Sequence, residues 1–142
     1  MKFYAALALL VAGVTAGVVL ARAAPPEAEP LVRIAELEID PAQLAAYKAL
    51  LAEEVEASVR LEPGVLMLHA VSLNDDPTQI RLLEVYADRA AYEAHLRSPQ
   101  FLKYKQGTAQ MVRKLRLRET TPILLCAKRD LPSAAAIACL AG

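Results

Sequence analysis

Residues 80–104 read IRLLEVYADRAAYEAHLRSPQFLKY, and the type of element changes partway along them. Residues 80–87 are mostly apolar and include isoleucine, valine and tyrosine, which is typical of a strand. Asp88 comes next, and an aspartate in this place accepts hydrogen bonds from the first amides of a helix. Apolar and aromatic side chains then recur every three or four residues, at Tyr92, His95 and Leu96. The stretch predicts a strand followed directly by an amphipathic helix.

Ser98-Pro99 interrupts that helix. Serine caps a helix start, and proline fits the first helical turn but not the interior. Helical spacing resumes at Phe101, Tyr104 and Thr108, which predicts a second helical segment that reaches about Met111.

Further strands are predicted on both sides of this stretch. Upstream, residues 65–73 form another apolar run, and the turn-rich Asn74-Asp75-Asp76-Pro77-Thr78 joins it to residues 80–87, which predicts a hairpin. Downstream, residues 112–119 alternate basic and aliphatic side chains, which predicts a last strand with one solvated face.

The domain is expected to begin with a strand at residues 31–39 and a long helix. Asp40-Pro41-Ala42-Gln43 is typical of a helix start, with Asp40 as the cap and Gln43 reaching back to it. This helix should end before Pro63-Gly64. The side chains expected to face the core are Leu44, Tyr47, Leu51, Val55 and Val59. Those expected on the polar side are Glu53, Glu54, Glu56 and Arg60.

The predicted order is strand, helix, strand, strand, helix, strand, which defines an α+β, ferredoxin-like fold. Such a fold has a four-stranded antiparallel sheet with both helices on one face. The other face should be polar in a monomer, yet residues 65–73 are apolar at both alternating sets of positions. Because an uncovered apolar face favours association, we expect a homodimer that packs sheet against sheet.

The two ends of the chain differ from this domain. Residues 1–23 contain Lys2, an uncharged apolar run and Ala21-Arg22-Ala23, which predicts a cleaved signal peptide, with a retained membrane anchor as the alternative. Residues 24–30 hold three prolines and predict a linker. We therefore expect an exported protein, periplasmic or secreted, with its domain at residues 31–121.

Residues 122–142 form a C-terminal extension whose structure the sequence leaves open. Its apolar run can extend the last strand, cross to a partner subunit or remain frayed. Cys126 and Cys139 can form a disulfide in an oxidising compartment, or they can stay as two small apolar side chains.

Composition excludes several classes of function. The chain has 16 basic and 16 acidic residues, so no excess of positive charge calls for nucleic acid. The sequence lacks the phosphate-loop, dinucleotide-binding, serine-hydrolase and zinc-protease motifs. With two histidines and two distant cysteines, no metal site is expected.

Residues 83–101, LEVYADRAAYEAHLRSPQF, resemble the antibiotic biosynthesis monooxygenase family, which includes small quinol-monooxygenase-like proteins. The shared features are a Glu-x-aromatic pattern on the third strand, an alanine-rich helix and a His-x-x-Ser-Pro-x-Phe element. Glu62-Pro63-Gly64 before the second strand also fits the family. The resemblance extends over about residues 31–121.

This resemblance implies a dimeric α/β barrel with an apolar pocket between sheet and helices in each subunit. It also implies oxidation of a small aromatic or quinol-type substrate by O₂, with no flavin, haem or metal cofactor. Some relatives degrade haem with a histidine and a tryptophan, but the histidine position falls near Tyr104 or Lys105 and the chain has no tryptophan. An asparagine that assists catalysis in a cofactor-free relative falls near Leu82.

Several side chains are candidates for such a pocket, and each has a structural alternative. The catalytic candidates are His69, Tyr86, Tyr92 and His95. The candidates for substrate binding are Met67, Leu82, Glu84 and Phe101. His69 can instead be a satisfied core histidine, and His95 can instead support the helix break. Glu84 can simply pair with Arg33 or Arg113.

Two functions remain open at this point. The first is a cofactor-independent monooxygenase that oxidises a quinol or a related electron-rich phenol. The second is a non-catalytic dimeric module that binds a hydrophobic small molecule. Leu82 favours the second because it cannot donate a hydrogen bond, whereas the protonatable rings favour the first.

Overall fold

The computed structural model of the chain describes residues 29–129 and 136–141. The signal peptide and most of the linker predicted above lie outside the described residues. The elements of the domain are β1 (Leu31–Ile39), a short 3₁₀ turn (Pro41–Gln43), α1 (Leu44–Leu61), β2 (Val65–Ser72), β3 (Gln79–Tyr86), α2 (Arg89–His95), α3 (Pro99–Thr108) and β4 (Val112–Thr120).

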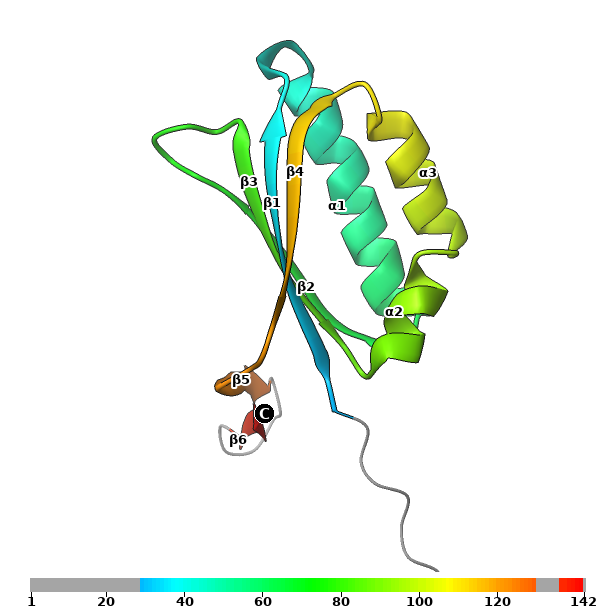
Figure 1. Cartoon of the computed structure of the whole chain (residues 1–142), viewed down its shortest axis with the longest axis vertical. Coiled ribbons are helices and arrows are strands. Elements are labelled where there is room, and N and C mark those ends of the chain that lie inside the picture. The colour runs from blue at the N-terminus through cyan, green and yellow to red at the C-terminus, as the bar shows by residue number, and fades with distance from the viewer. Residues whose placement is uncertain (1–28, 130–135, 142) are drawn as a thin grey trace, which may run out of the picture.

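These elements form the predicted α+β, ferredoxin-like fold. The four strands make one antiparallel sheet in the order β2-β3-β1-β4. Both long helices, α1 and α3, lie side by side against one face of this twisted sheet, and the other face carries no helix (Figure 1). Any pocket that the domain encloses must therefore lie between the helices and that one face.

The three helix starts are set by the residues that the sequence indicates. Asp40 accepts a hydrogen bond from the amide of Ala42 at 2.9 Å, and Asp88 accepts one from Ala91 at 2.7 Å. Ser98 caps α3 by accepting the amide of Phe101 at 3.3 Å. The predicted capping role of Gln43 is wrong, because its side chain donates instead to the carbonyl of Gln110, 3.1 Å away. This bond ties the start of α1 to the loop before β4.

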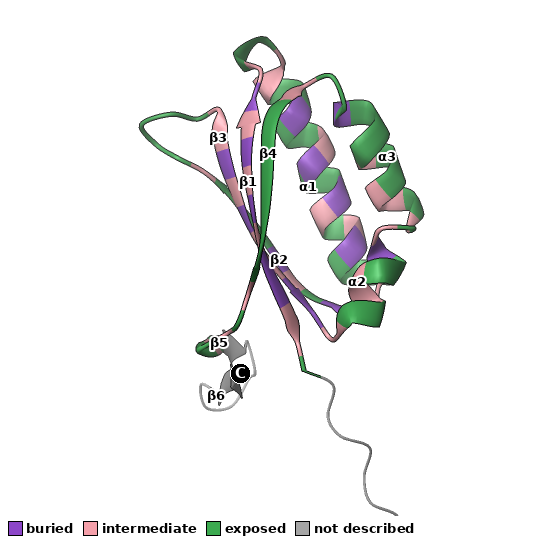
Figure 2. Ribbon diagram, in the orientation of Figure 1, coloured by how far each residue is buried: buried purple, intermediate pink, exposed green. Residues whose placement is uncertain are grey.

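The buried side of α1 differs from the prediction. Its buried residues are Tyr47, Leu51, Glu54 and Ser58, whereas Val59 is 45% exposed. Spacings of four, three and four residues place this set on one face of a helix. Glu54 therefore belongs to the interior and not to the polar side, and Val59 faces solvent. Figure 2 shows buried and exposed segments alternating along α1.

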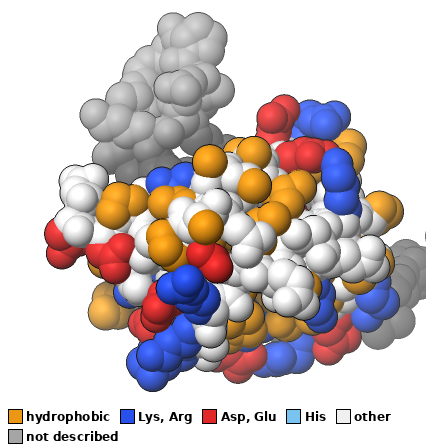
Figure 3. Space-filling model, turned by 90° about the horizontal axis from the view of Figure 1, so that it is seen from above, with side chains coloured by type: hydrophobic (Ala, Val, Ile, Leu, Met, Phe, Trp, Pro, Cys, Tyr) orange, Lys and Arg blue, Asp and Glu red, His pale blue; other side chains and the backbone are white. Residues whose placement is uncertain are grey.

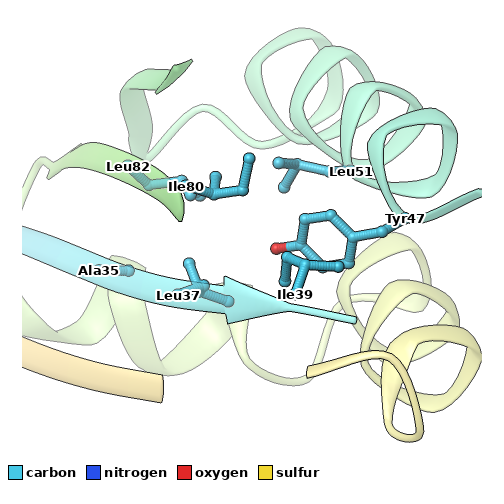
Figure 4. Close-up of a cluster of buried hydrophobic side chains, with 7 residues drawn as sticks. All are labelled: Ala35, Leu37, Ile39, Tyr47, Leu51, Ile80 and Leu82. Atoms are coloured by element: carbon cyan, nitrogen blue, oxygen red, sulfur yellow. The ribbon is translucent and has the colours of Figure 1, made fainter. Parts of the chain in front are cut away.

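The main core lies where α1 crosses β1 and β3. Tyr47 and Leu51 point from α1 toward the sheet (Figure 4). The strand side chains that they meet are Ala35, Leu37, Ile39, Ile80 and Leu82. Val65 and Leu68 of β2 form a second, smaller cluster with Tyr86. The space between these clusters and α2–α3 is left for the candidate site.

The face of the sheet without helices is apolar over only part of its area. Neighbouring positions on this face form rows across β2, β3, β1 and β4, since alternate residues of a strand share a face. One row contains His69, Leu83, Ile34 and Arg118, and the row toward the β2–β3 loop contains Val71, Arg81, Glu36 and Arg116. The apolar face expected from residues 65–73 is therefore confirmed for β2. On β4 the basic side chains form the solvated face that the sequence predicts, and Arg118 lies 3.3 Å from Glu36 of β1.

The C-terminal extension forms its own small hairpin. Strands β5 (Leu124–Arg129) and β6 (Ala136–Ala141) pair antiparallel in a separate two-stranded sheet. Their register places position 126 opposite position 139, and Cys126 is disulfide-bonded. Figure 1 shows β5 following β4 beyond the end of the main sheet. Among the described residues, no helix combines the length and apolar character needed to cross a membrane.

Candidate functional site

A cavity of about 430 Å³ lies between the helix-bearing face of the sheet and α2–α3. This volume is in the range of small-molecule sites. Leu115 and Leu117 of the edge strand β4 line the cavity and are 53% and 47% exposed, so the cavity opens along that edge. Its wall combines apolar side chains with convergent polar ones, chiefly Arg33, Glu54, Glu84, Tyr86, Tyr92, His95 and Tyr104.

Four aromatic rings form one wall of this cavity. The centroid of Tyr86 lies 5.3 Å from that of Tyr92 and 5.4 Å from that of His95. The ring of Phe101 lies 4.8 Å from that of His95. The sequence predicts that Tyr92 and His95 share one helix face, and the structure brings them together with Tyr86, which ends the preceding strand. A planar aromatic ligand can pack against such a wall.

His95 is the last residue of α2 and is almost completely buried. Its Nδ1 lies 3.1 Å from Oε1 of Glu62, and Gln100 donates to the same oxygen at 2.7 Å. Its Nε2 lies 3.7 Å from Oε1 of Glu54. Glu54 lines the cavity, but Glu62 does not. The Nδ1–H can therefore donate to Glu62, which leaves Nε2 on the side of the cavity wall that Glu54 forms.

Glu54 is buried on α1 and accepts a hydrogen bond from the hydroxyl of Ser58 at 2.8 Å. Burial raises the pKa of Glu54 above its ordinary value, although the Ser58 hydroxyl and the neighbouring His95 both act to lower it. A carboxyl with a raised pKa exchanges protons at a pH closer to neutrality than an exposed one. Glu54 and His95 thus place two proton-accepting atoms beside one hollow.

Glu84 of β3 lies on the same face of the sheet and lines the cavity. Its Oε2 accepts a hydrogen bond from the hydroxyl of Tyr86 at 3.3 Å. Burial raises the pKa of Glu84, and the positive charge of Arg33 offsets only part of that rise. The predicted association with Arg33 is therefore present as an electrostatic interaction, whereas Arg113 lies beside Asp40 at 3.3 Å.

Two tyrosine hydroxyls meet at the α1–α3 side of the cavity. The hydroxyls of Tyr47 and Tyr104 are 2.7 Å apart, and their rings pack edge to face with centroids 6.0 Å apart. Tyr47 is fully buried, whereas Tyr104 lines the cavity. This pair joins α1 to α3 and defines one boundary of the candidate site.

His69 and Met67 lie elsewhere. On β2, Leu68 and Ala70 are opposite the cavity-lining Glu84 and Leu82, so Met67 and His69 point to the sheet's other face. His69 borders a shallower hollow of about 620 Å³ between α1 and the β2 edge. The structure therefore brings Tyr86, Tyr92 and His95 together and leaves His69 apart. Of the substrate-binding candidates, Leu82, Glu84 and Phe101 line the cavity and Met67 does not.

Sequence reasoning missed Glu54, Glu62 and Arg33 as parts of the site. The spacing of Tyr47, Leu51, Glu54 and Ser58 along α1 was the available signal for Glu54. Glu62 was noted only as part of the Glu62-Pro63-Gly64 turn. Arg33 was named only as a possible partner of Glu84, and its alternate position with Ala35 and Leu37 on the first strand was the available signal that it faces the cavity.

The chain is thus a small α+β protein with one layer of helices on a ferredoxin-like sheet. A ligand-sized cavity with an aromatic wall lies between the helices and the sheet. The chain matches the family model described as antibiotic biosynthesis monooxygenase over residues 30–107, and it belongs to this family. No curated protein matches the chain.

Solved structures agree with this assignment. A Bacteroides thetaiotaomicron protein that is named as an antibiotic biosynthesis monooxygenase shares 48% identity, with 67% of this chain and 90% of that one covered and a TM-score of 0.66. A protein of Nitrosomonas europaea shares 23% identity over 66% of this chain and 98% of its own, with a TM-score of 0.62. One of Mycobacterium tuberculosis shares 24% identity over 74% and 100%, with a TM-score of 0.61. The last two show the fold alone.

Proposed function

We propose that this protein is a cofactor-independent monooxygenase that oxidises a quinol or a related electron-rich phenol with O₂ in the cavity beneath α2 and α3. The observation that carries the proposal is the environment of His95. Its Nδ1 is held by Glu62 at 3.1 Å, and its Nε2 lies on the side of the cavity wall formed by Glu54. A base oriented by a carboxylate is the arrangement that removes a proton from a hydroxyl.

The first step is removal of a proton from the substrate. The gap of 3.7 Å between His95 Nε2 and Glu54 Oε1 is too long for a direct hydrogen bond. A hydroxyl oxygen placed on the cavity side of this gap can lie about 2.8 Å from both atoms. His95 then accepts the proton, which leaves a phenolate against the aromatic wall. Glu54, whose pKa burial raises, can donate a hydrogen bond to the same oxygen when it is protonated.

The second step is electron transfer from the phenolate to O₂. One electron gives superoxide and a phenoxyl radical, and their recombination forms the new carbon–oxygen bond of a peroxide anion. This anion takes back the proton held by His95 and becomes a hydroperoxide. Loss of water from the resulting hydroperoxide then yields the quinone, so one oxygen atom stays in the product and the other leaves as water. The substrate supplies all the electrons, which is why the chemistry can proceed without a bound cofactor. The apolar lining, which includes Leu82 and Phe101, excludes competing water.

Oxygen uptake tests this function directly. Purified protein and hydroquinone-type substrates should give O₂ uptake above the uncatalysed rate, with ¹⁸O from ¹⁸O₂ in the quinone product. His95→Gln should lower kcat by about 10²- to 10⁴-fold. His69→Gln is the matched control, because His69 is the chain's other histidine and lies outside the cavity. Equal activity in His95→Gln and wild type would refute the proposed base.

Chelation and dialysis should leave the rate unchanged, because the proposal assigns no step to a metal or flavin. Loss of uptake after either treatment would contradict this part of the proposal.

The binding-module alternative has one supporting observation. Leu82 is buried on the cavity side of β3 and offers no hydrogen bond to a reacting oxygen. A protein of this kind would bind the quinol with a measurable Kd and take up no oxygen beyond the uncatalysed rate. Binding and uptake measured on one preparation therefore separate the two functions.

We also propose that the protein is exported and acts as a homodimer. Export rests on the charge and hydropathy pattern of residues 1–23. Dimerisation rests on the helix-free face of the sheet, where Val71 is 59% exposed. The end of the molecule seen in Figure 3 has acidic and basic side chains interspersed with hydrophobic ones, so this end offers no patch of a single charge.

A further inference from the structure

We propose that Arg33 is a receptor for an anionic oxygen group of the ligand, so that the cavity selects aromatic compounds that carry a negative charge. This inference deepens the proposed function and rests on its assignment of the cavity as the substrate site. It concerns a residue that no sequence pattern in the chain singled out.

Arg33 is a buried cation. It is 8% exposed and lines the cavity from the inner strand β1. Its Nε is buried and has no hydrogen-bond partner. Among the described residues, none accepts a hydrogen bond from this side chain, and no carboxylate lies within 4.0 Å of it. A buried guanidinium is normally paired, so one without a partner calls for an explanation.

The nearest acidic groups make their hydrogen bonds and ion pairs with other residues. Glu84 is opposite Arg33 in the β1–β3 register and attracts it electrostatically, but its carboxylate accepts the Tyr86 hydroxyl and makes no hydrogen bond with Arg33. Glu119 is opposite Arg33 in the β1–β4 register, but it pairs with Arg89 at 2.9 Å. Both potential partners therefore leave the guanidinium available to a ligand.

The Arg33 guanidinium is held against an aromatic ring. Its central carbon lies 4.4 Å from the ring centroid of Tyr92, which supports the charge without using any of the N–H donors. Tyr92 and Tyr86 separate Arg33 from His95 along the aromatic wall. A planar ligand on this wall can place one hydroxyl at His95 and direct an anionic oxygen to Arg33. Arginine suits this role because its planar fork matches a carboxylate.

The anionic oxygen has two chemical sources that this geometry accepts. One is a permanent carboxylate on the aromatic ring. The other is the phenolate that forms when a hydroxyl loses its proton. Hydroquinone and 2,5-dihydroxybenzoate carry the same two para hydroxyls and differ only in the carboxylate, so they distinguish these sources.

Anaerobic isothermal titration calorimetry with these two probes tests the proposal and needs no turnover. At pH 7, wild type should bind 2,5-dihydroxybenzoate at least tenfold more tightly than hydroquinone, and Arg33→Met should abolish this preference. Arg81→Met is the matched control, since Arg81 is a half-buried arginine of the same sheet outside the cavity. Arg33→Lys, which keeps the charge, should retain part of the preference. This variant still tests the proposal if Arg33→Met does not fold.

If the phenolate is the source, wild type will bind both probes similarly at pH 7. Its affinity for hydroquinone will then rise with pH toward the pKa of the probe, and this rise will be absent in Arg33→Met. Two results overturn the proposal. One is a preference for 2,5-dihydroxybenzoate that persists in Arg33→Met, and the other is a wild type that shows neither this preference nor the pH dependence. Absence of oxygen uptake alone would contradict the proposed function and leave this result standing.

Discussion

The Nδ1 atom of His95 lies 3.1 Å from Oε1 of Glu62, so the last residue of α2 is joined to the residue that ends α1. The two residues are 33 positions apart in the chain and come from elements on either side of the β2–β3 hairpin. Gln100 at the start of α3 donates to the same carboxylate oxygen. One carboxylate therefore fixes the imidazole in relation to three helices.

Glu62→Ala should reduce catalysis by removing the group that orients His95. We expect kcat to fall by about 10- to 100-fold with little change in KM, because an orienting carboxylate acts on the base and not on ligand binding. In a serine-protease triad, the corresponding change lowers kcat by about 10⁴-fold. Glu62→Gln should retain part of the activity, since its amide oxygen can still accept from Nδ1. Glu53→Ala, on the exposed side of α1, serves as the control. A parallel rise in KM and fall in Tm with kcat unchanged would show a merely structural role.

Glu84→Gln should make the protein more stable at neutral pH and leave it nearly unchanged in acid. Burial raises the pKa of Glu84 above its ordinary 4.5, so the folded state holds this proton more tightly than the unfolded state does. Wild-type stability therefore falls as pH rises from about 4.5 through the raised pKa of the folded state. Glutamine has the shape of the protonated acid and carries no charge at any pH, so the stability of the variant does not fall in this way as pH rises.

Thermal unfolding of both proteins between pH 4 and 8 checks this expectation. The Tm of the variant should match that of wild type at the acid end and exceed it increasingly toward neutral pH. Glu93→Gln, at an exposed position of α2, should leave the curve parallel to that of wild type. Parallel curves for Glu84→Gln as well would show that the carboxyl carries no net burial penalty.

Local patterns were sufficient to predict the helix starts and the aromatic wall. Asp88 and Ser98 act on amides three residues away, so the sequence contains the whole interaction. Tyr92 and His95 are three residues apart on one helix, and this spacing alone brings their side chains to the same face. Tyr86 joins them because the chain turns directly from β3 into α2.

Other parts of the site depend on contacts that no local pattern contains. Glu54 was assigned to solvent because it is charged, and only its partners Ser58 and His95 explain its burial. His69 lies on a strand that is apolar at both alternating sets of positions, so hydropathy could not determine its face. A register shift between Val65 and Met67 adds to this ambiguity. Arg33 is significant only because its neighbours are engaged elsewhere.

Tyr104→Phe should destabilise the protein more than Tyr47→Phe does. The hydroxyls of the two residues are 2.7 Å apart. Among the described residues, Tyr104 is the one hydrogen-bond partner of the Tyr47 hydroxyl, whereas the Tyr104 hydroxyl also interacts with the side chain of Thr108. Loss of the Tyr104 hydroxyl leaves that of the fully buried Tyr47 unsatisfied, which costs about 1–3 kcal/mol. Loss of the Tyr47 hydroxyl is less costly, because the Tyr104 hydroxyl that remains is at the cavity and can bind water.

Urea unfolding of both single variants and of the double variant gives the coupling energy of this pair. The double variant should be more stable than Tyr104→Phe, because no unsatisfied hydroxyl then remains. Equal losses in both single variants, with additive effects in the double variant, would show that the two hydroxyls are not coupled.

The proposed homodimer should be disrupted by a charge on the helix-free face of the sheet. Light scattering of the wild type at micromolar concentration should give twice the mass of one chain. Val71→Glu should shift the protein toward the monomer, because Val71 is 59% exposed on this face and burial of an unpaired carboxylate in an interface is unfavourable. Val59→Glu is the matched control, since Val59 is 45% exposed on α1 on the other side of the sheet. A monomeric wild type, or equal shifts in the two variants, would contradict packing through the sheet.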